Sequence, residues 1–376
     1  MPRINYGVPY KGSKNMIAEW VVSHVPECDT FIDVFAGGCA ITDYVLRTGR
    51  ASHVIANDRD QMPVKCFEMA VRGEFANEDR WISREDFFAS KDTDPYVRFC
   101  FSFGNNAKDY MYSTTIEPYK RAIHYVLFHD YWDDFDRLCP EVCDACRAAL
   151  DGITDRKERR IRFQQAFTER IKELSGDNWF APIVQDNPLY KTIKTKKPKR
   201  GLVACGGSYA PLEGEYGLQS LQRLQNLERL ERIQSLQSLE RPQSLESLQN
   251  LESLQNLESL QNLERLEPVL ETSNLDYRAL TERILTTDDA FVYCDPPYRG
   301  TQGYGEFDHD VFLDWALEIG RKRPILISEY AIDHDGFIEV DTRQKQSRLS
   351  AVTSKIVTEK LYTVKGGVYA TQNNIR

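Results

Sequence analysis

The chain of 376 residues lacks a long apolar run and lacks an excess of positive charge. No apolar stretch approaches the roughly 20 residues that a membrane-spanning helix needs, and the first residues contain no signal-peptide core. We therefore expect a cytoplasmic protein that has no membrane partner. Lysine and arginine number 48 against 57 aspartates and glutamates, which gives a formal net charge of −9. This balance excludes a wholly basic nucleic-acid coat protein, but it is compatible with a local basic face.

Two common phosphate-binding fingerprints are also missing. The chain contains neither a Gly-x-Gly-x-x-Gly turn nor a Gly-x-x-x-x-Gly-Lys-Ser/Thr loop, which weakens the case for a nicotinamide oxidoreductase. The nine cysteines are an odd number and thinly spread, as is typical of free thiols. Cys139, Cys143 and Cys146 lie close together but lack a fourth ligand nearby. We expect them in and around a helix, with a metal site as the alternative.

The apolar pattern predicts an α/β fold that is interrupted by an insert. A helical pattern covers residues 15–25, whereas residues 91–215 are rich in aromatic and basic side chains. One sheet that is interrupted by an inserted module explains these differences in sequence pattern better than two independent domains. The predicted strands are the apolar runs 30–35, 53–56, 290–294 and 324–328.

A leucine repeat follows the aromatic and basic region. From Leu218 to Leu266 an apolar residue recurs at every third position, and nearly all of these residues are leucine. The composition favours helix, but a period of three drifts around a helix of 3.6 residues per turn. Pro242 should also break or kink such a helix. Helical pieces, a stacked solenoid and a disordered spacer are the three alternatives.

The most specific motif is the tetrad from Asp295 to Tyr298, Asp-Pro-Pro-Tyr, directly after the apolar run 290–294. Two prolines after a strand stop its hydrogen-bond ladder and keep the backbone extended. An aspartate at the carboxyl end of a strand lies where open α/β sheets bind their ligands. The Tyr298 ring offers a flat face on which a heterocycle can stack. The alternative interpretation is a simple turn.

A glycine turn follows the first predicted strand. Small residues, Gly37 and Gly38 among them, stand between that strand and a helical pattern, so the backbone can approach an adenosine-type cofactor. The next predicted strand ends at Asp58, whose carboxylate can accept hydrogen bonds from ribose hydroxyls. The alternative role for Asp58 is the N-cap of the following helix.

These motifs and their order resemble the Dam-like DNA adenine methylases, which methylate adenine N6 with S-adenosylmethionine. The segment from Tyr10 to Lys14 resembles the family's amino-terminal motif, and the likeness covers about residues 5–90 and 270–330. It implies a Rossmann-like methyltransferase sheet flanked by helices. The implied parts are a discontinuous catalytic domain over 1–90 and 270–376, a mainly helical target-recognition region over 91–217, and the leucine-triplet insert over 218–267.

The resemblance also implies the roles of single residues. The catalytic tetrad is Asp295, Pro296, Pro297 and Tyr298, acting on an adenine flipped out of double-stranded DNA. A strand from Asn274 to Tyr277 holds the cofactor's adenine. No metal is implied, because the methyl sulfonium is already activated. The residues implied for S-adenosylmethionine are Tyr10 and Lys14 at its methionine end, Asp58 at its ribose, and Asp33, Phe35, Gly37, Gly38, Asp276 and Tyr277.

Two segments are candidates for DNA contacts. The run 191–200 carries six positive charges in ten residues, which suits phosphate contacts, although a solvated loop is the alternative. Asn105 lies in an asparagine-containing loop, and an Asn side chain can form two hydrogen bonds with adenine. The candidates in the basic run are Lys194, Lys196, Lys197, Lys199 and Arg200.

Two other functions stay open at this point. One is methylation of another planar amine such as cytosine N4, although the leading Asp295 favours adenine within the resemblance. The other is a catalytically idle DNA-binding or scaffold protein. We expect a monomer in a bacterial or phage-infected cell. The resemblance is compatible with a restriction endonuclease partner and equally with an orphan or phage-borne enzyme.

Overall fold

The computed structural model describes residues 5–175, 187–190, 269–299, 307–348 and 354–375. They form two compact units. The sheet unit comprises the described residues of 5–111 and 269–375, and the helical unit comprises 112–175 and 187–190. The basic run with Lys194, Lys196, Lys197, Lys199 and Arg200 lies outside the described residues, as does the leucine repeat.

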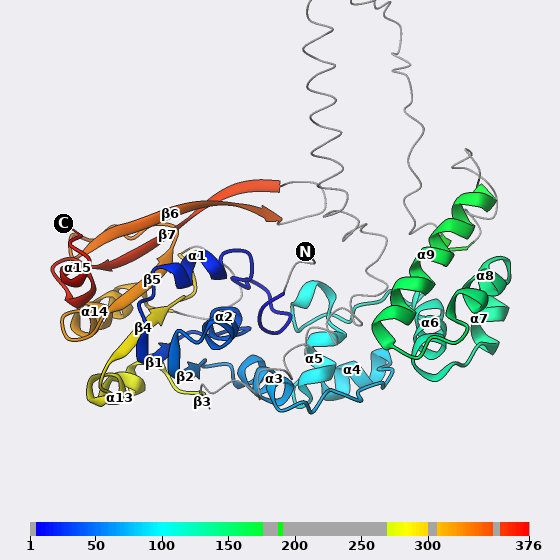
Figure 1. The fold of residues 1–376 in the computed structure, drawn as a ribbon, viewed down its shortest axis with the longest axis horizontal. Helices are drawn as coiled ribbons and strands as arrows, with labels where there is room; N and C mark the ends of the chain where they lie inside the picture. The colour runs from blue at the N-terminus through cyan, green and yellow to red at the C-terminus, as the bar shows by residue number, and fades with distance from the viewer. Residues whose placement is uncertain (1–4, 176–186, 191–268, 300–306, 349–353, 376) are drawn as a thin grey trace, which may run out of the picture. The chain divides into compact units, whose positions relative to one another are not determined.

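The sheet unit contains a seven-stranded sheet in the order β3-β2-β1-β4-β5-β7-β6 (Figure 1). The strands from β1 to β5 run parallel, whereas β7 runs antiparallel between β5 and β6. All four predicted strands are confirmed, as β1, β2, β4 and β5. The bounds are β1 (Cys28–Asp33), β2 (Ala51–Asn57), β3 (Val269–Ser273), β4 (Ala290–Cys294), β5 (Ile325–Glu329), β6 (Phe337–Arg348) and β7 (Ser354–Val364).

Strand β1 lies between β2 and β4 and marks the point where the strand order reverses. Phe31 of β1 stands opposite Val54 of β2 and opposite Phe291 of β4. Open α/β sheets form their ligand crevice at such a switch point, beyond the carboxyl ends of the strands. The topology therefore brings Asp33, the last residue of β1, and Asp295, which follows β4, to one crevice.

Helices cover both faces of this sheet, as the sequence predicts (Figure 1). On one face, Ile284 and Phe312 join the buried core that includes Val292 of β4. On the other face, the Tyr369 ring packs edge-on against Phe291, with ring centroids 5.8 Å apart. The helices are α1 (Ala18–Ser23), α2 (Ala40–Thr48), α3 (Gln61–Val71), α4 (Arg84–Ser90), α5 (Pro95–Cys100), α13 (Thr281–Thr286), α14 (His309–Gly320) and α15 (Val368–Gln372), with 3₁₀ helices η1 (Phe103–Asn105) and η5 (Tyr277–Leu280).

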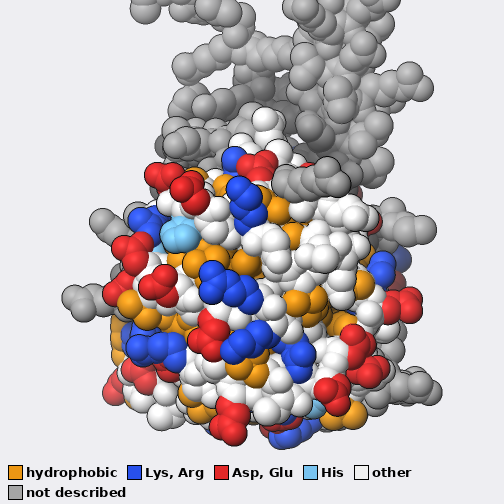
Figure 2. Space-filling model, turned by 90° about the vertical axis from the view of Figure 1, so that its left-hand side faces the viewer, with side chains coloured by type: hydrophobic (Ala, Val, Ile, Leu, Met, Phe, Trp, Pro, Cys, Tyr) orange, Lys and Arg blue, Asp and Glu red, His pale blue; other side chains and the backbone are white. Residues whose placement is uncertain are grey.

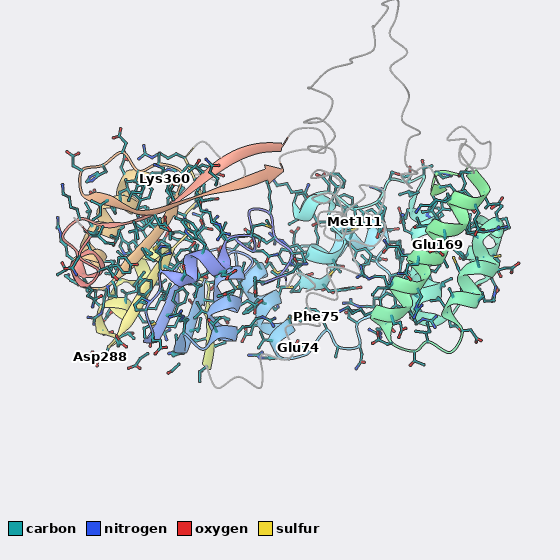
Figure 3. The ribbon with its side chains drawn as sticks, turned by 45° about the horizontal axis from the view of Figure 1, so that its top comes forward. Glu74, Phe75, Met111, Glu169, Asp288 and Lys360 are labelled. Carbon is teal, nitrogen blue, oxygen red and sulfur yellow. The ribbon has the colours of Figure 1, made fainter. Side chains whose placement is uncertain are left out.

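Residues 91–111 pack with the sheet unit. Phe75, which follows α3, lies against Tyr96 of α5 with ring centroids 6.4 Å apart (Figure 3). The Tyr110 hydroxyl donates a hydrogen bond to the Ile82 carbonyl at 2.8 Å. The first part of the region predicted to recognise the target therefore lies in the unit that carries the sheet.

The helical unit is built around aromatic side chains. Phe135, Phe163 and Phe167 are buried and contact one another, and Tyr190 packs on Phe167. Cys143 and Cys146 lie in a helix that Cys139 precedes, which confirms the helical interpretation of this cysteine group. Among the described residues, no three His, Cys, Asp or Glu side chains are grouped as metal ligands. The helices are α6 (Glu117–His129), α7 (Asp133–Leu138), α8 (Pro140–Leu150) and α9 (Arg156–Ser175).

Figure 2 views the sheet unit from the side of α14 and α15, where positive and negative side chains are interspersed. Glu318 of α14 and Lys322, which follows this helix, form one ion pair, with 3.1 Å between Nζ and Oε1. Within the described ranges, no helix is long and apolar enough to cross a membrane.

Candidate active site

A cavity of about 730 Å³ lies at the carboxyl ends of β1 and β4. Its volume is in the range of pockets that bind small molecules. The fold brings every residue of the predicted catalytic and cofactor-binding sets to this one cavity. They are Tyr10, Lys14, Asp33, Phe35, Gly37, Gly38, Asp58, Asp276, Tyr277, Asp295, Pro296, Pro297 and Tyr298.

The glycine turn after β1 is covered by the amino-terminal segment. The Val8 N–H donates a hydrogen bond to the Gly38 carbonyl at 2.8 Å. A Cβ added to Gly38 would lie 2.5 Å from the Cβ of Tyr10, which is closer than the two chains can pack. Gly37 has φ +47°, in the left-handed region that favours glycine. These two glycines therefore let residues 8–10 lie directly on the turn.

Gly7 is a further requirement of this contact, and replacing it by alanine should destabilise the protein. Its φ is +68°, and a Cβ there would lie 2.1 Å from the Gly38 carbonyl oxygen. Left-handed strain and overpacking together should lower the free energy of unfolding by about 2–5 kcal/mol, measured by urea denaturation. Gly49→Ala is the matched control, because Gly49 has φ +62° with nothing within 4 Å of its added Cβ. Equal losses in both variants would show that the close contact is unimportant.

Asp58 fastens the glycine turn from the end of β2. Its Oδ2 accepts a hydrogen bond from the Gly37 N–H, and its Oδ1 accepts one from the Asp60 N–H, both at 2.8 Å. Burial raises the pKa of Asp58 to about 6, although these two bonds favour the carboxylate. The alternative role as a helix N-cap is wrong, because Asp60 caps α3 by accepting a hydrogen bond from the Met62 N–H.

Asn57 joins three chain segments at this end of the sheet, a role that the sequence did not indicate although Asn57 directly precedes the predicted ribose ligand Asp58. Its Nδ2 donates hydrogen bonds to the carbonyls of Val34 and Leu275, both at 3.0 Å. Its Oδ1 accepts hydrogen bonds from the Leu275 N–H at 2.9 Å and from the Ser273 hydroxyl at 2.8 Å. The amide thus fixes the positions of the β1 turn and of the segment after β3.

The segment from Asn274 to Tyr277 is not the predicted strand. Strand β3 ends at Ser273, and the Asp276 carboxylate caps η5 by accepting a hydrogen bond from the Arg278 N–H. Hydrogen bonds from the Arg278 guanidinium and main chain hold the pKa of Asp276 below its usual value. The Tyr277 ring is buried against Phe35, with centroids 5.6 Å apart. Both predicted residues still line the cavity.

Asp33 is a buried carboxyl group at the inner wall of the cavity. Burial raises the pKa of Asp33 to about 7. A hydrogen bond from the Thr42 hydroxyl at 2.7 Å opposes this rise, whereas the charges of Asp295 and Asp58 add to it. Its Oδ1 is buried without a hydrogen-bond partner among the described residues. A cationic or hydrogen-bond-donating ligand group would satisfy this oxygen.

The raised pKa of Asp33 predicts a pH-dependent stability. Between about pH 4 and pH 7 the folded state keeps a proton on Asp33 that the unfolded state has lost, so stability should fall as pH rises. Between pH 5 and pH 7 this loss is at most about 3 kcal/mol, since each pH unit contributes about 1.4 kcal/mol. Urea denaturation at pH 5 and pH 8 measures the loss, which should be smaller in Asp33→Asn. The same loss in both proteins would contradict this role of Asp33.

The tetrad after β4 is held by residues from three other segments. Lys14 Nζ lies 2.7 Å from Asp295 Oδ2 and 4.7 Å from the centroid of the Tyr298 ring. Burial opposes the Lys14 charge, but the carboxylates of Asp295 and Glu359 outweigh burial and raise the pKa of Lys14. The Nε2 of His309 lies 2.8 Å from the carbonyl oxygen of Pro297.

Sequence reasoning missed Glu359, which lines the cavity, and His309, which contacts the tetrad at the Pro297 carbonyl. Glu359 lies on β7 and accepts a hydrogen bond from the Tyr298 hydroxyl at 2.6 Å. No local motif marks either residue, since each meets the tetrad only after folding. Glu359 stands between Thr358 and Lys360 in a strand of mixed polarity, so the local sequence gives no signal of its burial.

The predicted base-contacting residue Asn105 lies in η1, and its side chain is outside the described atoms. Its neighbours Asn106 and Lys108 line the cavity. The Asn106 Oδ1 accepts hydrogen bonds from the N–H groups of Lys108 and Asp109, at 2.8 and 3.0 Å. The loop that carries Asn105 therefore borders the candidate site.

The mixed α/β sheet and the cavity at its switch point fit the class of methyltransferase folds. Residues 10–133 match the family model of the D12 class N6 adenine-specific DNA methyltransferases. This match confirms the resemblance seen in the sequence and indicates an adenine-specific DNA methyltransferase, and the family implies S-adenosylmethionine as the methyl donor. The match covers Tyr10, Lys14, the glycine turn and Asp58, and it ends before the tetrad. No match was found among curated proteins.

Proposed function

We propose that the chain methylates N6 of an adenine that is flipped out of double-stranded DNA at a specific sequence. The observation that carries this proposal is the convergence of the tetrad, the glycine turn and Asp58 on one cavity. The tetrad is separated along the chain from the glycine turn and Asp58 by the whole insert. A fold that served only as a scaffold would not require buried charged groups such as Lys14 and Asp33 at this place.

The cavity fits S-adenosylmethionine, which supplies an activated methyl group when bound. The buried Asp33 Oδ1 and the nearby carboxylates suit a ligand of positive charge. We assign Asp58 to the ribose and Asp276 with Tyr277 to the adenine. Tyr10 and Lys14 are assigned to the methionine end, with Asp33, Phe35, Gly37 and Gly38 forming the wall between these groups.

The tetrad activates the target amine. The lone pair of an adenine amine is delocalised into the ring, so the nitrogen is a poor nucleophile. The Asp295 carboxylate and the Pro296 carbonyl accept its two N–H bonds and favour a more tetrahedral nitrogen with its lone pair directed outward. Pro297 keeps the segment extended. This chemistry relies on position and charge, so we propose that it requires no metal.

Tyr298 provides the stacking surface for the flipped base. Extrusion of a base costs a few kcal/mol, which contacts in the pocket must offset. The ring face lies beside Asp295, because Lys14 contacts both groups. An adenine stacked on Tyr298 is thereby brought next to the acceptor for its amine.

We assign contacts with the DNA to two further segments. Lys194, Lys196, Lys197, Lys199 and Arg200 supply phosphate contacts, whose loss should reduce the salt dependence of binding. Asn105 reads a base edge from the loop beside the cavity.

Site specificity is tested by sequencing modified bases in DNA from cells that express the chain. The proposal predicts N6-methyladenine at nearly every copy of one short sequence, and none in cells that carry an empty vector. Methyladenine scattered over unrelated sequences would contradict site-specific recognition. Modification of single-stranded but not double-stranded DNA in vitro would contradict the proposed flipping.

A further inference from the structure

We propose that Glu359 is a positioning residue of the methyl transfer: it holds the Tyr298 ring in the orientation that the flipped adenine requires. This inference rests on the proposed function. The Tyr298 hydroxyl donates a hydrogen bond to Glu359 Oε2 at 2.6 Å, and both side chains line the cavity. A hydrogen bond to a carboxylate is roughly twice as strong as one between neutral groups.

The place of Glu359 in the sheet argues against a role in folding alone. It stands on β7, is 0% exposed, and is followed by Lys360 on the outer side and by the buried Leu361. The alternation of a strand therefore turns Glu359 inward, where an apolar residue would pack at no electrostatic cost. Burying a carboxylate is expensive, and the hydrogen bond from Tyr298 offsets only part of that cost, so packing alone does not account for a glutamate here.

Tyr298 is held on three sides by separate parts of the sheet unit. Glu359 fixes its hydroxyl, and the Tyr330 ring lies edge-on at 4.5 Å between centroids and an interplanar angle of 78°. The Lys14 ammonium lies over the ring at 4.7 Å from its centroid. Through Tyr298, the loop after β4 therefore contacts both Tyr330, which follows β5, and Glu359 of β7. Of these contacts, only the one with Glu359 fixes the position of the hydroxyl end of the ring through a directional bond.

Glu359 also shapes the charge around the tetrad. Together with Asp295 it raises the pKa of Lys14. Lys14 can remain charged when an amine approaches Asp295, because a second buried carboxylate lies nearby. In this scheme Glu359 touches neither the base nor the methyl donor, so it acts on the methyl transfer through its hydrogen bond with Tyr298. Its loss should therefore lower kcat and leave the affinity for S-adenosylmethionine nearly unchanged.

The test is a double-mutant cycle with Glu359→Gln and Tyr298→Phe. Glu359→Gln keeps the shape of the side chain and removes the charge, and Tyr298→Phe keeps the ring and removes the hydroxyl. Each single change should lower the single-turnover rate of adenine methylation about tenfold to hundredfold. In the Tyr298→Phe background, Glu359→Gln should cost less than about threefold, since the shared bond is already absent.

Glu339→Gln is the matched control, because Glu339 pairs with Lys360 on the outer side of the same hairpin at 2.6 Å. Its rate should equal that of the wild-type protein. S-adenosylmethionine binding and thermal unfolding of every variant report whether the sheet unit remains folded.

Independent, multiplicative losses in the double variant, or a loss confined to cofactor affinity, would overturn the inference. If wild-type protein forms no N6-methyladenine, the proposed function itself fails. If the wild-type enzyme is active and the Glu359→Gln variant has the same rate, only the proposed role of Glu359 is contradicted, and the proposed function stands.

Discussion

We expect Asp295→Ala to lower turnover about a thousandfold or more while S-adenosylmethionine affinity changes only a few-fold. In the proposed mechanism the carboxylate accepts an N–H of the target amine in the transition state, so its removal should act on the chemical step. Cofactor affinity should persist because Asp58 and the glycine turn remain in place. Single-turnover methylation of DNA and calorimetric titration with S-adenosylmethionine measure the two quantities.

The Asp295→Ala variant leaves Lys14 as a buried cation without its carboxylate, which is a second possible cause of inactivity. The double variant Lys14→Leu/Asp295→Ala removes both charges and controls for this effect. It should be as inactive as the single variant. Substantial residual methylation in either variant would exclude Asp295 as the acceptor of the amine.

We expect Asn57→Asp to destabilise the protein by about 3–5 kcal/mol at pH 8. The new oxygen would face the carbonyls of Val34 and Leu275, to which the Asn57 Nδ2 now donates. Two hydrogen bonds would be lost, and an ionised carboxylate would be buried beside two acceptors. Urea denaturation followed by circular dichroism measures the free energy of unfolding.

Asn373→Asp is the matched control for this charge change. Asn373 is exposed, and its Nδ2 donates to the Tyr369 carbonyl at 2.9 Å. Water can solvate the new carboxylate there, so the cost should be below about 1 kcal/mol. A similar cost at both positions would show that the buried network around Asn57 adds little to stability.

The sequence predicts those parts of the site that are encoded locally. The four apolar runs give β1, β2, β4 and β5 because parallel strands buried on both faces are continuously apolar. The tetrad and the glycine turn are recognisable because each combines a strand end with residues of restricted or unusually free backbone. Their meeting in one cavity follows from the sheet topology, which the motif order indicated.

Contacts between distant segments could not be read from the sequence. Nothing local shows that Lys14 pairs with Asp295, or that Asn57 binds the segment after β3. The alternative role of Asp58 as a helix cap is wrong: Asp58 and Asp60 are both acceptable N-cap residues, and only the geometry selects Asp60. Likewise, the strand predicted for residues 274–277 is wrong, because β3 ends at Ser273 and Asp276 caps η5.

The most direct test of the account is the transfer of a labelled methyl group from S-adenosylmethionine to unmethylated bacterial DNA. The reaction contains a chelator, and the product nucleosides are separated before counting. The proposed adenine methylation predicts label in N6-methyladenine and none in other nucleosides, with Asp295→Ala as the inactive control. Label in N4-methylcytosine, or the absence of label from a protein that binds S-adenosylmethionine, would contradict it.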